Sequence, residues 1–140
     1  MPRHDLADRD YVALADFRHQ LRRFLAFSEE RARAIGLEPR QHQLLLALRG
    51  LPADVAPTVG ALAERLLLRH HTVVELVDRL QRRGLVRRTR ASEDRRQTRL
   101  AITARGRALL ARLSIEHQLE LASAGPALVA SLRRALRGRP

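Results

Sequence analysis

The residues with the clearest chemical potential in this 140-residue chain are arginines concentrated in one stretch. Between Arg79 and Arg107 there are eleven arginines and only two acidic residues, Glu93 and Asp94. This stretch carries most of the formal net charge of +12, and all 27 basic residues of the chain are Arg. Because guanidinium groups donate paired hydrogen bonds to phosphate oxygens, the patch predicts an anionic partner such as a nucleic acid. The alternative is a charge run that is merely solvated.

Other kinds of chemistry find little support in the sequence. The chain has no Cys, which excludes disulfides, thiolate catalysis and Cys-based zinc sites. It also lacks a glycine-rich phosphate loop, a Gly-x-Ser-x-Gly turn and a His-Glu-x-x-His helix, so we expect neither an enzyme nor a cofactor. We predict no metal site, although one alternative remains open, built from His19, His42, His117, Glu116 and Glu120.

Helical spacing of apolar residues organises the first part of the chain. It predicts a long helix over residues 8–35 that ends at Gly36. A shorter helix is expected to begin at Pro39 and to stop at Gly50. Thr58 then predicts the N-cap of a third helix, which runs to about Leu67.

The middle of the chain predicts a helix-turn-helix followed by a β-wing. Only two or three residues separate the third helix from the next helical pattern, Thr72 to Leu80, and two helices joined so tightly must cross steeply. This fourth helix is expected to end at Gly84. Residues 85–90 and 97–102 then alternate apolar and basic side chains, which predicts two antiparallel strands joined by the polar turn 91–96.

The C-terminal part predicts two more helices. Thr103 is expected to cap the first, which runs to about Ala122, and Gly125 and Pro126 are expected to break it before a final helix. The fold class is therefore mostly α with a small β-wing, in the order α-α-α-α-β-β-α-α. Three segments form one continuous domain: an N-terminal dimerisation helix (1–36), a winged helix-turn-helix lobe (37–102) and C-terminal dimerisation helices (103–140).

The two ends of the chain predict a homodimer. The long first helix and the C-terminal helices both carry apolar stripes that so small a domain cannot cover by itself, and a second copy would supply the missing surface. The leucines expected at this interface are Leu14, Leu21, Leu25, Leu128 and Leu132.

Nothing in the sequence predicts a membrane partner. No apolar run approaches the roughly 20 residues that span a bilayer. The N-terminus mixes acidic and basic residues and lacks the apolar core of a signal peptide, so we expect a cytoplasmic protein.

The start of the fourth helix offers polar side chains suited to reading DNA bases. A recognition helix places such residues at its first turn, where they meet base edges in the major groove. Arg69 can bind guanine O6 and N7 together, and Thr72 can contact a thymine methyl group or a phosphate. Adjacent histidines on a helix point about 100° apart, which suits a shared metal poorly. The expected base contacts are Arg69, His70, His71, Thr72 and Glu75.

The predicted wing and its surroundings suit other parts of DNA. Asp94, Arg95 and Arg96 lie at the tip of the strand pair, where a guanidinium can enter a narrow minor groove. Contacts to phosphates position a protein on DNA without reading its sequence. The expected phosphate contacts are Thr58, Arg82, Arg83, Arg87, Arg88, Arg90 and Arg99.

Five segments carry a family resemblance: TVGALAERL from Thr58, TVVELVDRL from Thr72, RRGLVRR from Arg82, EDRRQTRLAIT from Glu93 and ARGRALL from Ala104. In this order and spacing they resemble the winged helix-turn-helix of the MarR family of bacterial transcriptional regulators. The resemblance implies a ligand-responsive repressor that binds a pseudo-palindromic double-stranded DNA operator as a homodimer. The turn before the recognition helix departs from the family, because Leu67 and Leu68 stand where relatives often have Gly or a short polar residue. Base specificity therefore does not transfer.

The resemblance also implies roles for residues that chemistry alone leaves undecided. In such a wing Arg95 or Arg96 would insert into the minor groove while Asp94 braces it. A small phenolic or anionic effector would bind between the dimerisation helices and the DNA-binding lobe. The residues expected to line that pocket are Phe17, Phe24, His42, Leu45 and Leu113.

Two other classes of function remain open from the sequence. The arginine patch would also suit an architectural protein that binds DNA regardless of sequence. The fold would also suit a protein-interaction module that has lost DNA binding. Salt dependence and competitor DNA separate a sequence-specific regulator from an architectural protein, and failure to bind any DNA selects the interaction module.

Overall fold

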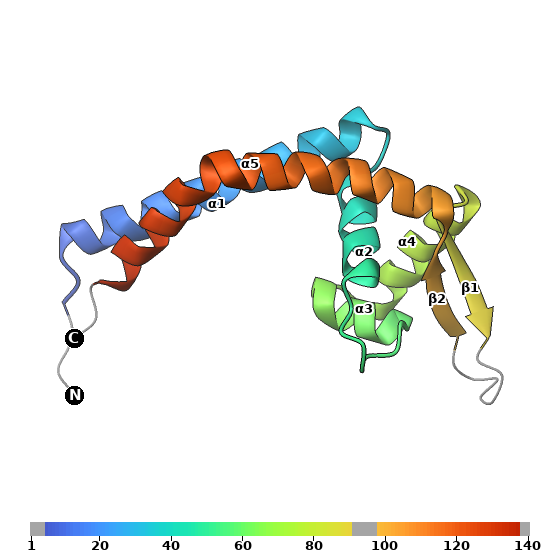
Figure 1. Cartoon of the computed structure of the whole chain (residues 1–140). Coiled ribbons are helices and arrows are strands. Elements are labelled where there is room, and N and C mark those ends of the chain that lie inside the picture. The colour runs from blue at the N-terminus through green and yellow to red at the C-terminus, as the bar shows by residue number, and fades with distance from the viewer. Residues whose placement is uncertain (1–4, 91–97, 138–140) are drawn as a thin grey trace. The chain divides into compact units, whose positions relative to one another are not determined.

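The computed structural model describes residues 5–90 and 98–137, which fall into two compact units. Unit 1 combines the chain up to Arg31 with the chain from Ile115 onward. Unit 2, which we call the lobe, comprises Ala32–Ser114. The lobe contains the three shorter helices and the two strands that are labelled together in Figure 1.

Helix α1 (Asp8–Ala34) forms as its apolar spacing predicts. Asp10 in the first turn places a carboxylate next to the unpaired N–H groups of the helix start, where negative charge is favourable. The helix ends at Gly36, whose positive φ of 81° lets the chain reverse so that Leu37 N–H donates to the Ala32 carbonyl at 2.9 Å. The expected helix and its glycine cap are confirmed.

Helices α2 (Pro39–Arg49) and α3 (Val59–Leu66) begin at the residues whose chemistry predicts a helix start. Pro39 occupies the first turn of α2, where its missing N–H costs no hydrogen bond. The Thr58 hydroxyl accepts a hydrogen bond from Ala61 N–H at 3.2 Å and so caps α3.

Helix α4 (His70–Arg82) follows α3 after the three residues Leu67–Arg69. Leu67 adopts the left-handed conformation, with φ 54° and ψ 40°, and this turns the chain from one helix into the next. A leucine is disfavoured there because its Cβ crowds the backbone. The apolar face of α4 is buried, and the predicted helix-turn-helix is confirmed. The buried side chains are Val73, Leu76, Val77 and Leu80.

Strands β1 (Val86–Arg90) and β2 (Thr98–Ile102) pair antiparallel, as predicted. Val86 lies opposite Ile102, and Arg88 lies opposite Leu100. Directly opposed side chains share a face of the sheet, so Val86, Arg88 and Leu100 lie on one face, on which Val86 and Leu100 are buried. The expected turn at 91–96 lies outside the described residues.

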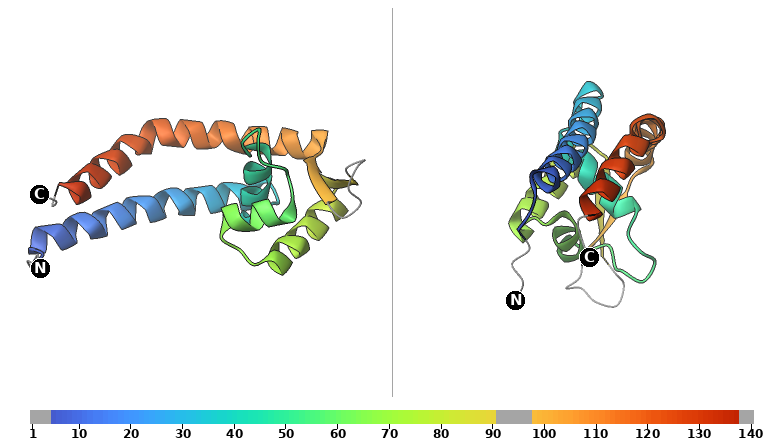
Figure 2. Two further views of the ribbon diagram at one scale, coloured as in Figure 1. Left: turned by 90° about the horizontal axis from the view of Figure 1, so that it is seen from below. Right: turned by 90° about the vertical axis from the view of Figure 1, so that its left-hand side faces the viewer.

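Helix α5 (Ala104–Leu136) starts as predicted, with Gly106 N–H donating to the Thr103 hydroxyl at 3.1 Å. The predicted break at Gly125 and Pro126 is wrong, because the helix continues through Pro126 and the two expected C-terminal helices are one (Figure 2). Gly125 has no Cβ to clash with the proline ring, which is the contact that normally bars a helical residue before proline. Pro126 is also exposed, so solvent can reach the helix where the proline N–H is missing.

The core of the lobe collects apolar side chains from each of its elements. Leu45 of α2, Leu62 of α3, Leu80 of α4, Val86 of β1 and Leu113 of α5 are almost completely buried there. This shared core holds the helix-turn-helix and the strands as one body. It therefore fixes which faces of α4 and of the strand pair point outward.

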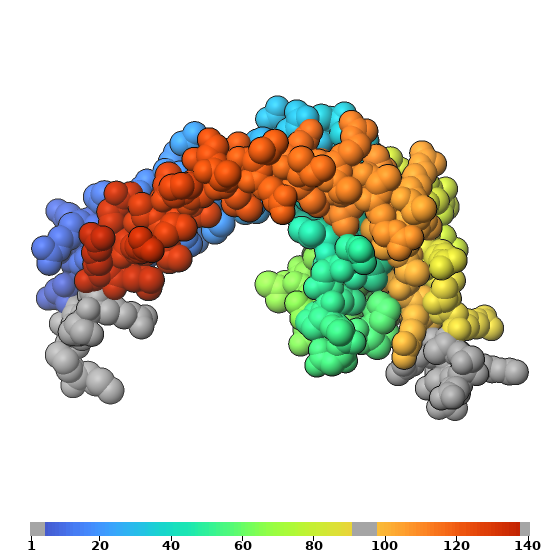
Figure 3. Space-filling model, in the orientation of Figure 1, coloured from blue at the N-terminus to red at the C-terminus, as the bar shows by residue number. Residues whose placement is uncertain are grey.

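In unit 1 the described parts of α1 and α5 run antiparallel, as the blue and red side chains in Figure 3 show. Arg134 donates to Asp16 at 2.9 Å, and near the other end Arg31 makes a two-bond ion pair with Glu116. The hydrogen bonds to Glu116 and the attraction of that carboxylate raise the pKa of the Arg31 guanidinium. Side chains thus connect the two helices at both ends.

No helix among the described residues is long and apolar enough to cross a membrane.

Candidate nucleic-acid interface

The first turns of α4 present the polar side chains that the sequence singled out. Arg69 is the N-cap residue, with an extended backbone, and its side chain is exposed. His70, His71 and Glu75 are also exposed, and Thr72 is half-buried. Because Val73, Leu76 and Val77 hold the opposite side of α4 in the core, this polar face is directed away from the lobe. Of the five expected base-reading residues at the start of α4, the structure exposes Arg69, His70, His71 and Glu75 and half-buries Thr72.

Exposed arginines flank this helix at its C-terminal end and on the strand pair. Arg82 lies in the last turn of α4, and Arg87, Arg90 and Arg99 lie on the strands, all with exposed side chains. Arg87 follows the buried Val86, and the alternation of the strand places it on the other face of the sheet. These guanidinium groups are therefore available to phosphate oxygens.

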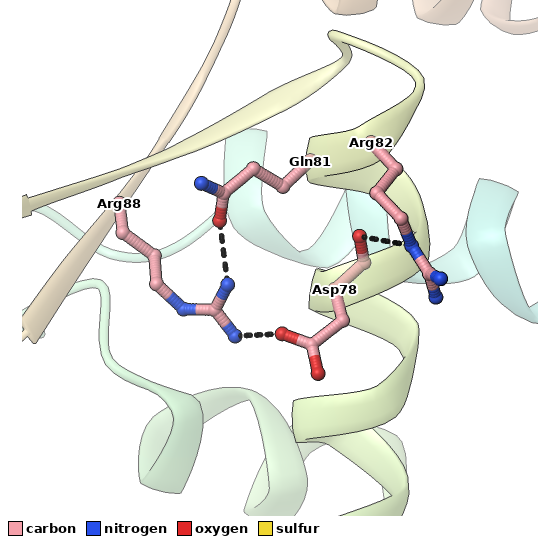
Figure 4. Close-up of polar contacts among 4 residues, drawn as sticks. All are labelled: Asp78, Gln81, Arg82 and Arg88. Carbon is pink, nitrogen blue, oxygen red and sulfur yellow. Dashed lines mark hydrogen bonds and ion pairs between the residues drawn. The ribbon is translucent and has the colours of Figure 1, made fainter.

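Arg88 differs from its neighbours because the strand turns it toward α4. Its guanidinium donates to the Gln81 side-chain oxygen and to the Asp78 carboxylate, both at 2.5 Å (Figure 4). In the same view Arg82 donates a long 3.4 Å bond from Nε to the Asp78 carbonyl. The sequence predicts a phosphate contact for Arg88, but in the structure its guanidinium already binds Gln81 and Asp78 within the lobe.

Arg83 is likewise held inside the lobe. Its Nη1 donates to the Gly36 carbonyl at 2.8 Å and to the Gln41 side-chain oxygen at 3.0 Å. The same Gln41 oxygen accepts the backbone N–H of Glu38 at the start of α2. Arg83 therefore joins the end of α4 to Gly36 and to Gln41 of α2. A phosphate contact at Arg83 stays a prediction.

The remaining expected DNA contacts are Thr58 and the three residues at the tip of the wing. The Thr58 side chain is half-buried, and its hydroxyl oxygen already accepts the α3 cap bond. Asp94, Arg95 and Arg96 lie outside the described residues, so their expected place at the tip of the wing stays a prediction.

Comparison with known proteins identifies this architecture. Residues 35–97, which span the helix-turn-helix and the first strand, match the model of the MarR family. The match covers 63 of the chain's 140 residues and lies within the lobe. The structure of the chain is similar to that of a MarR family transcription regulator with 24% sequence identity, at a TM-score of 0.74 over 91% of this chain and 87% of that one. The predicted winged helix-turn-helix fold is thereby confirmed.

Two further solved structures extend the likeness over the long helices. AbsC from Streptomyces coelicolor is 19% identical, with a TM-score of 0.74 over 98% of this chain and all of that one. A mutant of MepR from S. aureus, solved bound to an oligodeoxyribonucleotide, is 20% identical, with a TM-score of 0.65 over 95% and 98% of the two chains. No curated protein matches the chain. These structures share the fold of this chain, and one of them carries DNA.

The expected effector-pocket residues lie in both units. Leu45 and Leu113 are buried in the core of the lobe, and His42 is 4% exposed. Phe17 is half-buried in unit 1. Phe24, also in unit 1, lines a hollow of about 330 Å³ whose wall also includes Gln20, Arg23, Glu30, Glu120 and Leu128.

The histidines considered for metal binding have other surroundings. His117 Nε2 lies 2.7 Å from the Ser28 hydroxyl, and its ring meets Phe24 and Phe27 edge to face. In the described part of the chain no three His, Asp or Glu side chains group closely enough to hold a metal ion.

Sequence reasoning missed the partners that hold the arginines. Asp78, Gln81 and Gln41 read as ordinary polar helix residues, and nothing in their local spacing marks them. Asp78 and Arg88 are ten positions apart, in a helix and in a strand, so no single periodicity relates them. Only the phase of the strand, with Val86 buried and Arg88 two residues later, would have suggested that Arg88 faces the helix.

Proposed function

We propose that this protein is a member of the MarR family and a sequence-specific transcriptional regulator that binds a pseudo-palindromic DNA operator as a homodimer and acts as a repressor. The observation that carries the proposal is the exposed start of α4, where Arg69, His70, His71 and Glu75 are exposed while Val73, Leu76 and Val77 of the same helix are buried. The exposed Arg82, and the exposed arginines of the strands, supply phosphate contacts beside it. A cytoplasmic location accompanies this function.

Binding to DNA from the region upstream of its own gene tests the proposal. Fluorescence anisotropy compares this duplex with a scrambled one at several salt concentrations. We expect a preference of about 10³-fold or more at physiological salt, since specific sites exceed non-specific DNA by at least that ratio. Equal and steeply salt-dependent binding to both duplexes would favour an architectural protein, and no binding to either would favour an interaction module.

Single substitutions assign roles within the interface. Arg69→Ala should lower affinity for the operator and relax the preference at one base pair, because a bidentate base contact contributes about 1–3 kcal/mol. Arg87→Ala should weaken binding to every duplex alike and reduce the salt slope by about 1. We expect Arg96→Ala to cost about 1–3 kcal/mol. Unchanged affinity of that variant would remove the wing arginine from the mechanism.

The proposed homodimer is supported by apolar side chains that unit 1 leaves uncovered. Leu14 and Leu25 are each 46% exposed, Leu21 is 38% exposed and Leu132 is 41% exposed, while Leu128 is half-buried. Exposed leucines in such number on two neighbouring helices are typical of a protein interface. A second copy of the chain offers the same surface and would cover them by two-fold symmetry.

Replacing Leu21 and Leu25 together by Glu tests this interface. We expect monomers in sedimentation and loss of operator binding, because paired half-sites need two lobes. The matched control is Leu46→Glu, at a leucine of the lobe that is 50% exposed. A dimer that persists in the double variant would refute the interface.

We also propose a small effector that releases the protein from DNA. The hollow lined by Phe24 combines aromatic surface with the polar side chains of Arg23, Glu30 and Glu120, which suits a phenolic compound. Titrating the operator complex with a panel of phenolic acids should release DNA for at least one compound, and Phe24→Ala should weaken that response. Release that is unchanged in Phe24→Ala would move the effector site elsewhere.

A further inference from the structure

The contact between β1 and the last turns of α4 carries an inference beyond the proposed recognition of DNA, on which it rests. Arg88 lies on the face of the sheet that packs on the lobe, opposite the buried Leu100. Its guanidinium reaches two side chains one turn apart on α4, Asp78 and Gln81 (Figure 4). One planar group with two partners fixes direction as well as distance.

We propose that Arg88 is a positioning residue, which together with Asp78 and Gln81 sets the placement of the wing strands relative to the recognition helix. The side chain of Arg88 is 30% exposed and that of Asp78 is 48% exposed, so the pair lies at the edge of the lobe and is partly shielded from water. An arginine committed to a carboxylate adds little net charge toward DNA. Arg88 therefore affects binding by holding the strands, and with them the exposed Arg87 and Arg99, in a fixed position relative to α4.

The direction in which one substitution changes the affinity for the operator separates a positioning role of Arg88 from a phosphate contact. Removing a carboxylate from a DNA-binding surface normally strengthens binding, because it reduces repulsion of phosphates and would here free Arg88 to contact them. If the pair positions the wing, Asp78→Asn instead weakens operator binding by about two- to fivefold for each lobe engaged, as expected for a partly exposed ion pair. The matched control is Glu64→Gln on α3, an exposed carboxylate whose removal should leave affinity unchanged or raised.

The salt dependence of binding gives a second readout. Arg88→Gln should lower affinity without changing the slope of log affinity against log salt, because no phosphate contact is lost. Arg87→Gln, at the neighbouring residue on the other face of the sheet, should reduce that slope by about 0.9. In the Arg88→Gln background Asp78→Asn should not weaken binding further, and Asp78→Glu alone should retain most of the affinity. A reduced slope for Arg88→Gln, or a gain in affinity for Asp78→Asn, would overturn the proposal.

Hydrogen exchange tests the positioning without DNA, so its result stands even if the proposed function fails. In Asp78→Asn the backbone amides of β1 should exchange faster than in the wild type, while those of α3 keep their rates. Unchanged exchange in β1 would overturn the positioning role. Wild-type protein that shows no preference for the operator would instead contradict the proposed function alone.

Discussion

Replacing Gly106 by Ala should destabilise the lobe, although Ala is the better helix former. Gly106 lies buried in the first turn of α5, next to the base of the wing. A Cβ on this residue would lie 2.3 Å from the Leu85 carbonyl oxygen and 2.8 Å from Ile102 Cγ1, where distances below 3.0 Å are essentially never found. The same Leu85 oxygen accepts the Thr103 N–H at 3.0 Å, so moving it strains a hydrogen bond at the start of the helix.

The expected magnitude follows from two opposing effects. Helix propensity favours Ala over Gly by about 1 kcal/mol. Overpacking against backbone costs up to about 3 kcal/mol, and the Leu85 backbone would have to retreat by about 0.7 Å to reach the 3.0 Å limit. We therefore expect a net loss of about 2 kcal/mol in the free energy of unfolding, or a fall of about 8 °C in Tm.

Urea unfolding followed by circular dichroism measures this loss, at one protomer concentration for all variants because dimerisation shifts apparent stability. The matched control is Gly60→Ala in α3, where the added Cβ would meet only the Thr58 hydroxyl at 3.9 Å. This control should be as stable as the wild type or more stable, by up to about 1 kcal/mol. Gly106→Ala that equals or exceeds the wild type in stability would refute the close packing of α5 on the wing base.

Three further substitutions should change stability in ways that the structure defines. Leu67→Gly should raise the free energy of unfolding by about 0.5–1 kcal/mol, because it relieves a positive φ at a side chain that is 91% exposed; a lower urea midpoint would contradict this. Arg83→Met should lower the free energy of unfolding by about 1–2 kcal/mol, because it removes the hydrogen bonds to the Gly36 carbonyl and the Gln41 side chain. Arg82→Met, at an exposed side chain, should lower it by less than about 0.5 kcal/mol in the same assay. The raised pKa of Arg31 means that its contribution is complete below the ordinary pKa of arginine and is lost only above the folded-state value. The stability difference between wild type and Arg31→Gln should therefore stay constant between about pH 7 and 10, and a difference that falls over this range would show that Arg31 loses its proton.

The expected interface could be predicted in outline but not residue by residue. The amphipathic pattern of α4 placed His71 and Glu75 on the exposed side, since Val73 and Leu76 had to face the core. The same reasoning treated every arginine of the patch alike. It could not separate Arg87 from Arg88, because the difference lies in which face of β1 meets α4.

Local chemistry decided where elements begin and end. The cap at Thr58, the start at Pro39 and the reversal at Gly36 depend on groups within four or five residues along the chain, and all three appear in the structure as expected. The break predicted at Pro126 is wrong, because the steric rule that disfavours a helical residue before proline is weakened when that residue is glycine. The preceding Gly125 lacks the Cβ that makes a helical residue before proline unfavourable.

By itself, therefore, the sequence determined the helix-turn-helix, the strand pair and the arginine patch, because periodicity, caps and charge are properties of neighbouring residues. Only the tertiary structure decided which arginines remain available to a partner. Arg83 and Arg88 find acceptors in Gly36 and Asp78, which become neighbours only when α2, α4 and β1 close on a common core. A guanidinium binds whichever acceptor the fold brings within hydrogen-bond distance, and that distance is a property of packing rather than of sequence order.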